Sequence, residues 1–158
     1  MRLLSSKGLD LIKQFEGLGL KPYLCSAGRP TIGYGMTFYP NGKKVTLKDA
    51  AITKVQAHEM LKQIVSKFIK DVDGLVTSKV TQNQFDALVS FAYNVGTDID
   101  QDKIAEGLGD STLLKKVNKD PNDKTISAEF SKWNKSAGKV STGLVNRRKK
   151  EAELYFTK

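Results

Sequence analysis

Glu16 is the residue of this chain whose surroundings best suit acid chemistry. It lies between Phe15 and Gly17, with Leu18 next, at the start of a glycine-rich segment. Apolar neighbours raise the pKa of a carboxyl group, so that it can stay protonated near neutral pH and donate a proton. The general acid of a glycoside hydrolase has this property. A glutamate at a helix end is more often a solvated surface residue, and the residue types alone leave both interpretations open.

Metal chemistry lacks the residues that it requires, and a catalytic triad built on the single histidine would need a cleft position that helix packing does not suggest. The chain has one histidine, His58, and one cysteine, Cys25. These are too few for a soft-metal site, so we expect no metal and no organic cofactor. His58 falls beside the apolar stripe of an expected helix, and we interpret it as a partly buried histidine whose polar atoms have partners.

Two loop motifs are incomplete. The acidic run 98–102 resembles the start of a calcium loop, but Lys103 stands where that loop requires glycine. The stretch Gly33-Tyr34-Gly35 lacks the third glycine of a dinucleotide-binding fingerprint. We interpret the acidic run as a solvated loop, and we expect no nucleotide cofactor.

The elements around Glu16 follow from local signals. Residues 5–15 are predicted as a short helix with a serine N-cap, which ends at Glu16-Gly17. Residues 17–46 are rich in glycine and proline and contain short β-type runs such as 31–34, which predict a small turn-rich sheet. The pair Asn41-Gly42 is a strong turn signal.

The rest of the chain is predicted to be helical. Capping boxes at Thr53-x-x-Gln56 and Thr81-x-x-Gln84 each begin a long apolar stripe, and Gly96 ends the second. Shorter helices are predicted at 111–118, 127–135 and 143–156. The order of helix, small β region and then only helices indicates an α+β domain with two lobes. No linker or repeat divides the chain, so residues 1–158 are expected to form a single domain.

The charge distribution favours a polyanionic partner. The formal net charge is +9, and both ends of the chain are basic. Nucleic acid, anionic lipid and cell-wall polymers all fit such an excess. The run 147–150, Arg-Arg-Lys-Lys, lies on a predicted amphipathic helix, and we interpret it as a solvated basic face that could attract anionic lipid or wall polymers.

Signals for membrane insertion or export are absent from the sequence. No apolar run approaches the roughly 18 residues of a membrane span, and the N-terminal MRLLSSKG lacks the apolar core and cleavage site of a signal peptide. A single cysteine allows no intrachain disulfide, which is compatible with a reducing compartment.

Three groups of motifs occur in the order found in one known family. They are Phe15-Glu16-Gly17, Lys21-Pro22-Tyr23 and Gly28-x-x-Thr31-Ile32-Gly33-Tyr34-Gly35-x-Thr37; then Thr81-x-x-Gln84-x-x-Ala87-Leu88-x-Ser90-Phe91-x-Tyr93-Asn94-x-Gly96; and finally Phe130-x-x-Trp133 with Gly143-Leu144-x-x-Arg147-Arg148-x-x-Glu151. With these motifs the chain resembles the phage-type lysozymes, which are endolysins or muramidases among the glycoside hydrolases, over nearly its whole length. The resemblance implies a small β lobe and a larger helical lobe joined by a long helix.

The resemblance implies an active site of Glu16, Cys25 and Thr31. Glu16 would donate a proton to the leaving glycosidic oxygen, and the Thr31 hydroxyl would position a water molecule or the opposing group. Cys25 stands where the family usually has aspartate, although some members have cysteine there. No other carboxylate occurs between Glu16 and Asp49 to replace it.

The role of Cys25 stays open at this point. A thiol acts as a base or nucleophile once a nearby cation or helix end has lowered its pKa, and Lys21 and Arg29 are near enough in sequence to do so. The alternative is that Cys25 is a small buried apolar residue, while Glu16 and Thr31 handle water alone.

Further positions follow from the same resemblance. The resemblance implies that Thr37, Tyr93 and Thr112 line the sugar-binding cleft. The residue types alone suggest structural roles instead: Thr37 as a strand residue, Tyr93 as a core aromatic and Thr112 as a helix cap. Met36 stands where the family usually has histidine, and we expect packing to replace that contact.

The implied activity is hydrolysis of the β-1,4 bond between N-acetylmuramic acid and N-acetylglucosamine in peptidoglycan, leading to lysis of the host cell. A monomer without a specific nucleic-acid partner is expected, held in the host cytoplasm until it is released to the periplasm and cell wall. A lytic transglycosylase that uses Glu16 alone and a catalytically inactive wall-binding protein are the alternatives. A nucleic-acid-binding role is suggested by charge alone.

Overall fold

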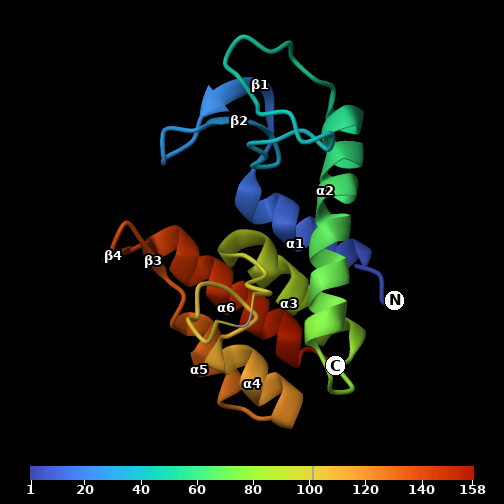
Figure 1. The fold of residues 1–158 in the computed structure, drawn as a ribbon, viewed down its shortest axis with the longest axis vertical. Coiled ribbons are helices and arrows are strands. Elements are labelled where there is room, and N and C mark those ends of the chain that lie inside the picture. Colours follow the sequence, from blue (N-terminus) through green and yellow to red (C-terminus); the bar gives the residue numbers. More distant parts are fainter. Residues whose placement is uncertain (101) are drawn as a thin grey trace. The chain divides into compact units, whose positions relative to one another are not determined.

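The computed structural model describes residues 1–100 and 102–158, and it has an α+β architecture (Figure 1). Its contacts divide the chain into two compact units: residues 12–67, called the β unit here, and residues 1–11 with 68–158, called the helical unit. In order along the described chain, the elements are α1 (Ser6–Glu16), β1 (Gly19–Leu24), β2 (Pro30–Gly33), α2 (Lys54–Leu75), α3 (Gln82–Val95), α4 (Thr112–Lys119), α5 (Ile126–Ser131), β3 (Lys135–Ser136), β4 (Lys139–Val140) and α6 (Thr142–Phe156). The expected α+β class is confirmed.

The β unit is built on the antiparallel hairpin β1–β2. Its register places Gly19 opposite Gly33 and Tyr23 opposite Thr31, with an irregularity between Gly19 and Tyr23. Directly opposite side chains in such a pair are close neighbours. The small sheet that the glycine-rich segment predicted is therefore present, and it brings the strand after residue 18 against the strand that carries Thr31.

Helices α2 and α3 begin where local capping signals place them. The Thr53 and Gln56 side chains each accept a hydrogen bond from the other residue's backbone N–H (3.1 and 2.8 Å), and Thr81 and Gln84 do the same (3.2 and 2.9 Å). Each box satisfies two of the backbone donors that a helix start leaves unpaired. The predicted starts of α2 and α3 are thus confirmed.

Helix α3 forms the core of the helical unit. Every residue from Gln84 to Ala92 is buried, and α3 packs against α6. The Phe91 ring contacts Phe130 and Trp133 edge to face, with centroids 5.6 and 5.4 Å apart. Aromatic rings prefer this geometry, because the edge of one ring is attracted to the face of the other.

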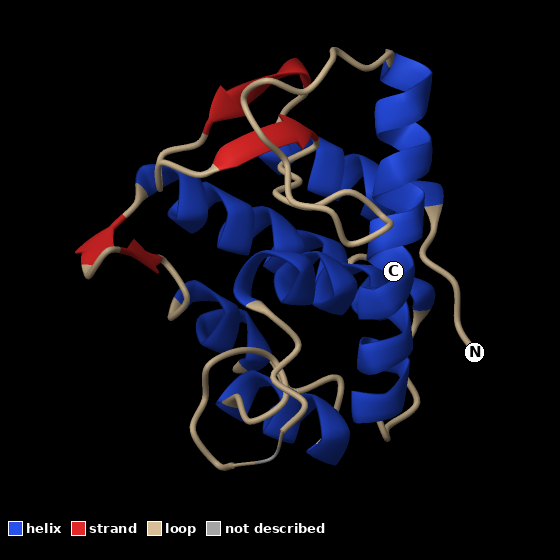
Figure 2. Ribbon diagram, turned by 45° about the horizontal axis from the view of Figure 1, so that its top comes forward, coloured by secondary structure: helices blue, strands red, loops and turns tan. Residues whose placement is uncertain are grey.

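The prediction of only helices after residue 46 is wrong in one segment. The helix predicted at 127–135 is α5, which ends at Ser131. The chain then continues into the hairpin β3–β4, drawn as a small pair of arrows beside the helices in Figure 2. Ala137 and Gly138 join the strands with φ of 50° and 78°. Two consecutive positive φ values are typical of a type I′ turn. Strands of two residues are too short to give an alternating pattern, so the sequence did not reveal them.

The interpretation of run 147–150 as a solvated basic face is wrong for its first half. Arg147 and Arg148 are only 3% and 0% exposed, and both contact the fully buried carboxylate of Glu151 (Nε–O 3.2 and 2.8 Å). The Ser90 hydroxyl of α3 also donates to that carboxylate (2.8 Å). A buried cation needs such a partner, which is why these arginines turn inward while the two lysines after them stay exposed.

Within the described residues, no helix combines the length and the apolar character that crossing a membrane requires.

Candidate active site

Glu16 is the last residue of α1, and its carboxylate rests against a glycine. Gly17, with φ of 69°, ends the helix, and its N–H donates to the Lys13 carbonyl (3.0 Å). A Cβ atom built on Gly35 would overlap the Glu16 carboxylate. Gly35 also has φ of 74°, so glycine is required there both for the turn and for the close approach.

The apolar flank that the sequence suggested for Glu16 is only partly present. Phe15 is half-buried, but Leu18 is 41% exposed. The turn after β2, and not Leu18, provides the surface against which the half-buried carboxylate lies. Sequence reasoning missed this contact because Gly35 is far from Glu16 along the chain.

Cys25 and Thr31 lie at the loop end of the hairpin β1–β2. Cys25 follows β1, and its backbone N–H donates to the Arg29 carbonyl (3.0 Å). Thr31 is buried in β2, with its hydroxyl 2.9 Å from the same carbonyl. Cys25 itself is half-buried. The Arg29 carbonyl in the loop between the strands therefore accepts from both the Cys25 backbone and the Thr31 hydroxyl.

This loop lowers the pKa of the Cys25 thiol. The largest cause is hydrogen bonding from the Arg29 backbone, followed by hydrogen bonding from the Thr31 side chain, while the positive charge of Arg29 contributes less. The sequence suggested that cationic side chains would act on Cys25; Arg29 does so mainly through its backbone. A lower pKa increases the thiolate fraction near neutral pH, and the thiolate is the reactive form.

The phenol of Tyr23 is influenced by the charges of both Glu16 and Cys25. Its pKa is raised first by burial and then by the negative charges of Glu16 and Cys25. Both groups must therefore lie near its phenol, because such effects fade with distance. Tyr23 was not among the expected site residues, and its only sequence signal was the motif Lys21-Pro22-Tyr23.

The three expected substrate-binding residues are distributed over both units. Thr37 is a half-buried residue of the β unit, and its carbonyl accepts from the Val45 N–H (3.0 Å). Tyr93 belongs to α3 and packs against Phe68, with centroids 5.1 Å apart. Thr112 is the exposed first residue of α4, whose N-cap is the preceding serine. The alternative interpretation of Thr112 as the helix cap is wrong, because Ser111 caps α4, and Thr37 lies outside β1 and β2.

Met36 is buried, and its methyl carbon occupies the space that a Cβ on Gly33 would need. The expected replacement of a polar contact by packing is confirmed at this position.

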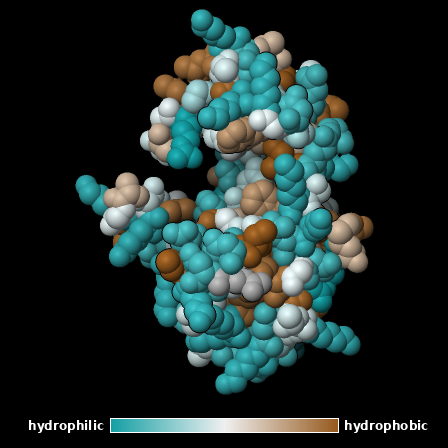
Figure 3. All heavy atoms as spheres, viewed as in Figure 1, coloured by the Kyte–Doolittle hydropathy of each residue, from teal (hydrophilic) through white to brown (hydrophobic). Residues whose placement is uncertain are grey.

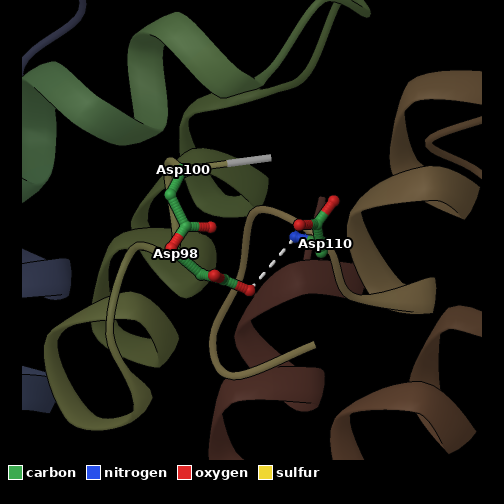
Figure 4. A group of neighbouring side chains, drawn as sticks. All are labelled: Asp98, Asp100 and Asp110. Carbon is green, nitrogen blue, oxygen red and sulfur yellow. Dashed lines mark hydrogen bonds between the residues drawn. The ribbon is translucent and has the colours of Figure 1, made fainter. Parts of the chain in front are cut away.

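The acidic run forms a folded loop (Figure 4). The carboxylates of Asp98, Asp100 and Asp110 gather within 4.8 Å of one another. One oxygen of Asp98 accepts backbone N–H groups of Glu106, Gly107 and Asp110 (3.0, 3.1 and 3.4 Å). Asp98 thereby accepts hydrogen bonds from backbone N–H groups that would otherwise bond to water, which gives this aspartate a structural role in the loop.

Comparisons with known proteins found a matching family model and similar relatives. A family model described as phage lysozyme matches residues 13–151. The endolysin of Bacillus phage PZA is 44% identical over 154 residues, covering 96% of this chain and 54% of the relative. The endolysin of Salmonella phage P22 is 33% identical over 157 residues, covering 99% of this chain and 100% of the relative.

A solved structure is similar as well. The endolysin from Escherichia coli O157:H7 phage FAHEc1 superposes with a TM-score of 0.84 at 42% sequence identity, covering 98% of this chain and 94% of that chain. The present chain spans about half the length of the relatives from Bacillus phages PZA and B103, 54% in each case.

Proposed function

Because the chain belongs to the phage lysozyme family, we propose that it is a muramidase that lyses bacterial cell walls. The proposed reaction is hydrolysis of the β-1,4 bond between N-acetylmuramic acid and N-acetylglucosamine in peptidoglycan. Relatives named endolysins support action on the cell wall. The observation that carries the proposal is the position of Glu16, held against Gly35 in the same unit as the Cys25–Thr31 pair.

Glu16 acts as the general acid in this proposal. Its carboxyl proton passes to the glycosidic oxygen as the bond between that oxygen and the anomeric carbon breaks. The sugar left behind passes through an oxocarbenium-like transition state. The close approach of the carboxyl group to Gly35 limits the positions open to it, which favours proton transfer because the donor is already placed.

Cys25 and Thr31 act on the water molecule. The Cys25 thiolate accepts a proton from water while the water oxygen bonds to the anomeric carbon, and the Thr31 hydroxyl holds that water by a hydrogen bond. The lowered pKa of Cys25 supports this role, because a neutral thiol is a poor base. Thr37, Tyr93 and Thr112 are proposed to contact the sugars.

Replacement of Glu16 tests the proposal. Glu16→Gln keeps the shape of the side chain but cannot donate its proton, so we expect the rate of wall clearing in a turbidity assay to fall by about 100-fold or more. Glu153→Gln on α6 is the matched control, since Glu153 is exposed and pairs with Lys150, and it should keep the wild-type rate. Equal clearing by Glu16→Gln and wild type would contradict the proposal.

Product analysis separates the two enzymatic alternatives. A hydrolase adds water to the broken bond, whereas a lytic transglycosylase closes an anhydro ring and releases a product lighter by one water. We expect mass spectrometry of digested peptidoglycan to find the hydrated sugar. An inactive wall-binding protein would bind purified walls without clearing them.

The remaining expectations belong to the same proposal. The enzyme works as a monomer on glycan strands, without a specific nucleic-acid partner, and stays in the host cytoplasm until another protein releases it to the wall. Retention of a DNA fragment in a gel-shift assay at physiological salt would contradict the statement about nucleic acid.

A further inference from the structure

Lys13 makes two contacts that link α1 to other parts of the β unit. Its Nζ lies 2.7 Å from Nδ1 of His58 on α2. The same ammonium lies over the ring of Tyr34, 5.4 Å from its centroid. Tyr34 is buried in the turn that follows β2, so this side chain of α1 contacts two segments that are remote from it in sequence.

The contact with His58 defines the state of the imidazole ring. A lysine ammonium can only donate hydrogen bonds, so Nδ1 must be the acceptor, and the neutral ring then carries its proton on Nε2. The other charged groups near His58 lie on α2: Glu59 Oε1 is 4.0 Å from Nε2 and also pairs with Lys62 (3.4 Å). Protonation of the ring would turn Nδ1 into a donor and break its bond to Lys13.

These contacts involve the helix that carries Glu16 and the turn against which its carboxylate rests. Lys13 is three residues before Glu16 on α1, and its carbonyl accepts the Gly17 N–H that ends this helix. Tyr34 directly precedes Gly35, against which the carboxylate rests. The Lys13 side chain therefore joins the helix that carries the acid to the turn that supports it.

We infer that Lys13 and His58 are positioning residues for Glu16. Lys13 holds the last turn of α1 against the 33–36 turn, and His58 holds Lys13 there from α2. The bond requires Nδ1 of His58 to be the acceptor. This inference rests on the proposed role of Glu16 as the acid.

Three variants measure the effect on turnover. His58→Leu removes the acceptor, Lys13→Met removes the donor and the charge, and His58→Asn keeps an acceptor near the position of Nδ1. A small displacement of an acid lowers turnover more than substrate binding, so we expect kcat to fall about tenfold in His58→Leu and Lys13→Met, with KM within about twofold of wild type. His58→Asn should recover most of kcat.

Controls distinguish positioning from loss of fold. Lys62→Met removes an exposed lysine of the same region and should leave kcat unchanged. Circular dichroism at the assay temperature must show every variant folded. Wild-type kcat in His58→Leu would overturn the inference.

A spectroscopic test is independent of activity. The ¹⁵N NMR signals of the His58 ring should show an unprotonated Nδ1 and a protonated Nε2 in wild type, and this preference should weaken in Lys13→Met. Protonation of Nδ1 in neutral wild-type protein would overturn the inference even if Glu16 is the acid. Full activity of Glu16→Gln would overturn the proposed function and leave the NMR result standing.

Discussion

The absence of a Cβ atom at Gly35 makes room for the Glu16 carboxylate. The Glu16 carboxylate occupies the place where any other residue would carry its Cβ, and this contact is part of how the proposed acid is held. A larger residue at position 35 would both strain the backbone and displace the carboxylate. The two effects can be separated, because other glycines of the β unit have a positive φ but no atoms near a built Cβ.

Gly35→Ala should therefore abolish most activity. Gly42→Ala is the matched control, because Gly42 has a φ of 84° but nothing within 4 Å of a built Cβ. Each change costs about 1–2 kcal/mol of backbone strain, which urea unfolding measures, but only Gly35→Ala also displaces Glu16. Clearing assays should show a large loss for Gly35→Ala and a small one for Gly42→Ala. Similar losses in both variants would contradict the positional role of Gly35.

The Cys25 thiol differs from an aspartate in the pH range over which it is charged. An aspartate is ionised at neutral pH, whereas a thiol becomes charged only as pH rises through its pKa. Hydrogen bonds from the Arg29 backbone and the Thr31 side chain lower that pKa. If the thiolate is the base, activity rises with pH as Cys25 ionises.

Thr31→Val should shift this rise to higher pH. Valine removes a hydroxyl that stabilises the thiolate, so the pKa of Cys25 increases and a higher pH is needed to charge it. The pH dependence of Cys25 alkylation by iodoacetamide measures the pKa directly. Cys25→Asp should instead move the rise in kcat/KM to more acid pH. An alkylation midpoint that is the same in wild type and Thr31→Val would contradict this account.

At the scale of elements, the turn of the hairpin β3–β4 has a strained backbone at one residue. Ala137 adopts φ of 50° in the turn, a region that alanine disfavours. Asparagine tolerates this region, and Asn-Gly is the preferred pair of a type I′ turn. We therefore expect the residue type that is preferred at position 137 to depend on the backbone conformation more than on any side-chain contact.

Ala137→Asn should stabilise the protein by about 0.5–1 kcal/mol in urea unfolding. Ala128→Asn is the opposite control: Ala128 lies exposed in α5, where asparagine is a poorer helix former, so it should destabilise by about 0.5 kcal/mol. Destabilisation by both variants would show that the turn is not strained at Ala137.

At the scale of the whole molecule, the basic charge is carried largely by exposed lysines. Hydrophilic side chains cover much of the face shown in Figure 3. With Arg147 and Arg148 buried, Lys135 and Lys139 on the hairpin β3–β4 are exposed cations beside α6. We propose that these lysines, and not the arginines, attract anionic wall polymers or lipid.

Binding to purified walls should therefore weaken as salt is added, because salt screens exposed charges over about 10 Å at 0.1 M ionic strength. The double variant Lys135→Gln with Lys139→Gln should bind several-fold more weakly than wild type at low salt and equally at high salt. Arg148→Gln should act through stability instead, since its charge is buried with Glu151. Salt-independent wall binding by wild type would contradict the role of the lysines.

Much of this protein was predictable because it depends on neighbouring residues. Helix starts at Thr53 and Thr81 need only a residue three positions away to complete a capping box, and the turn at Gly42 needs only glycine and its neighbours. The sequence by itself thus determined the helices, the small sheet, the α+β class and, through the order of its motifs, the expected family.

The tertiary structure decided what depends on remote segments. It turned Arg147 and Arg148 inward, because both pair there with the buried Glu151 carboxylate, which also accepts a hydrogen bond from the Ser90 hydroxyl of α3. It also placed Gly35 behind Glu16 and His58 beside Lys13. Such contacts form between residues that only packing brings together, so no local pattern of residue types announces them.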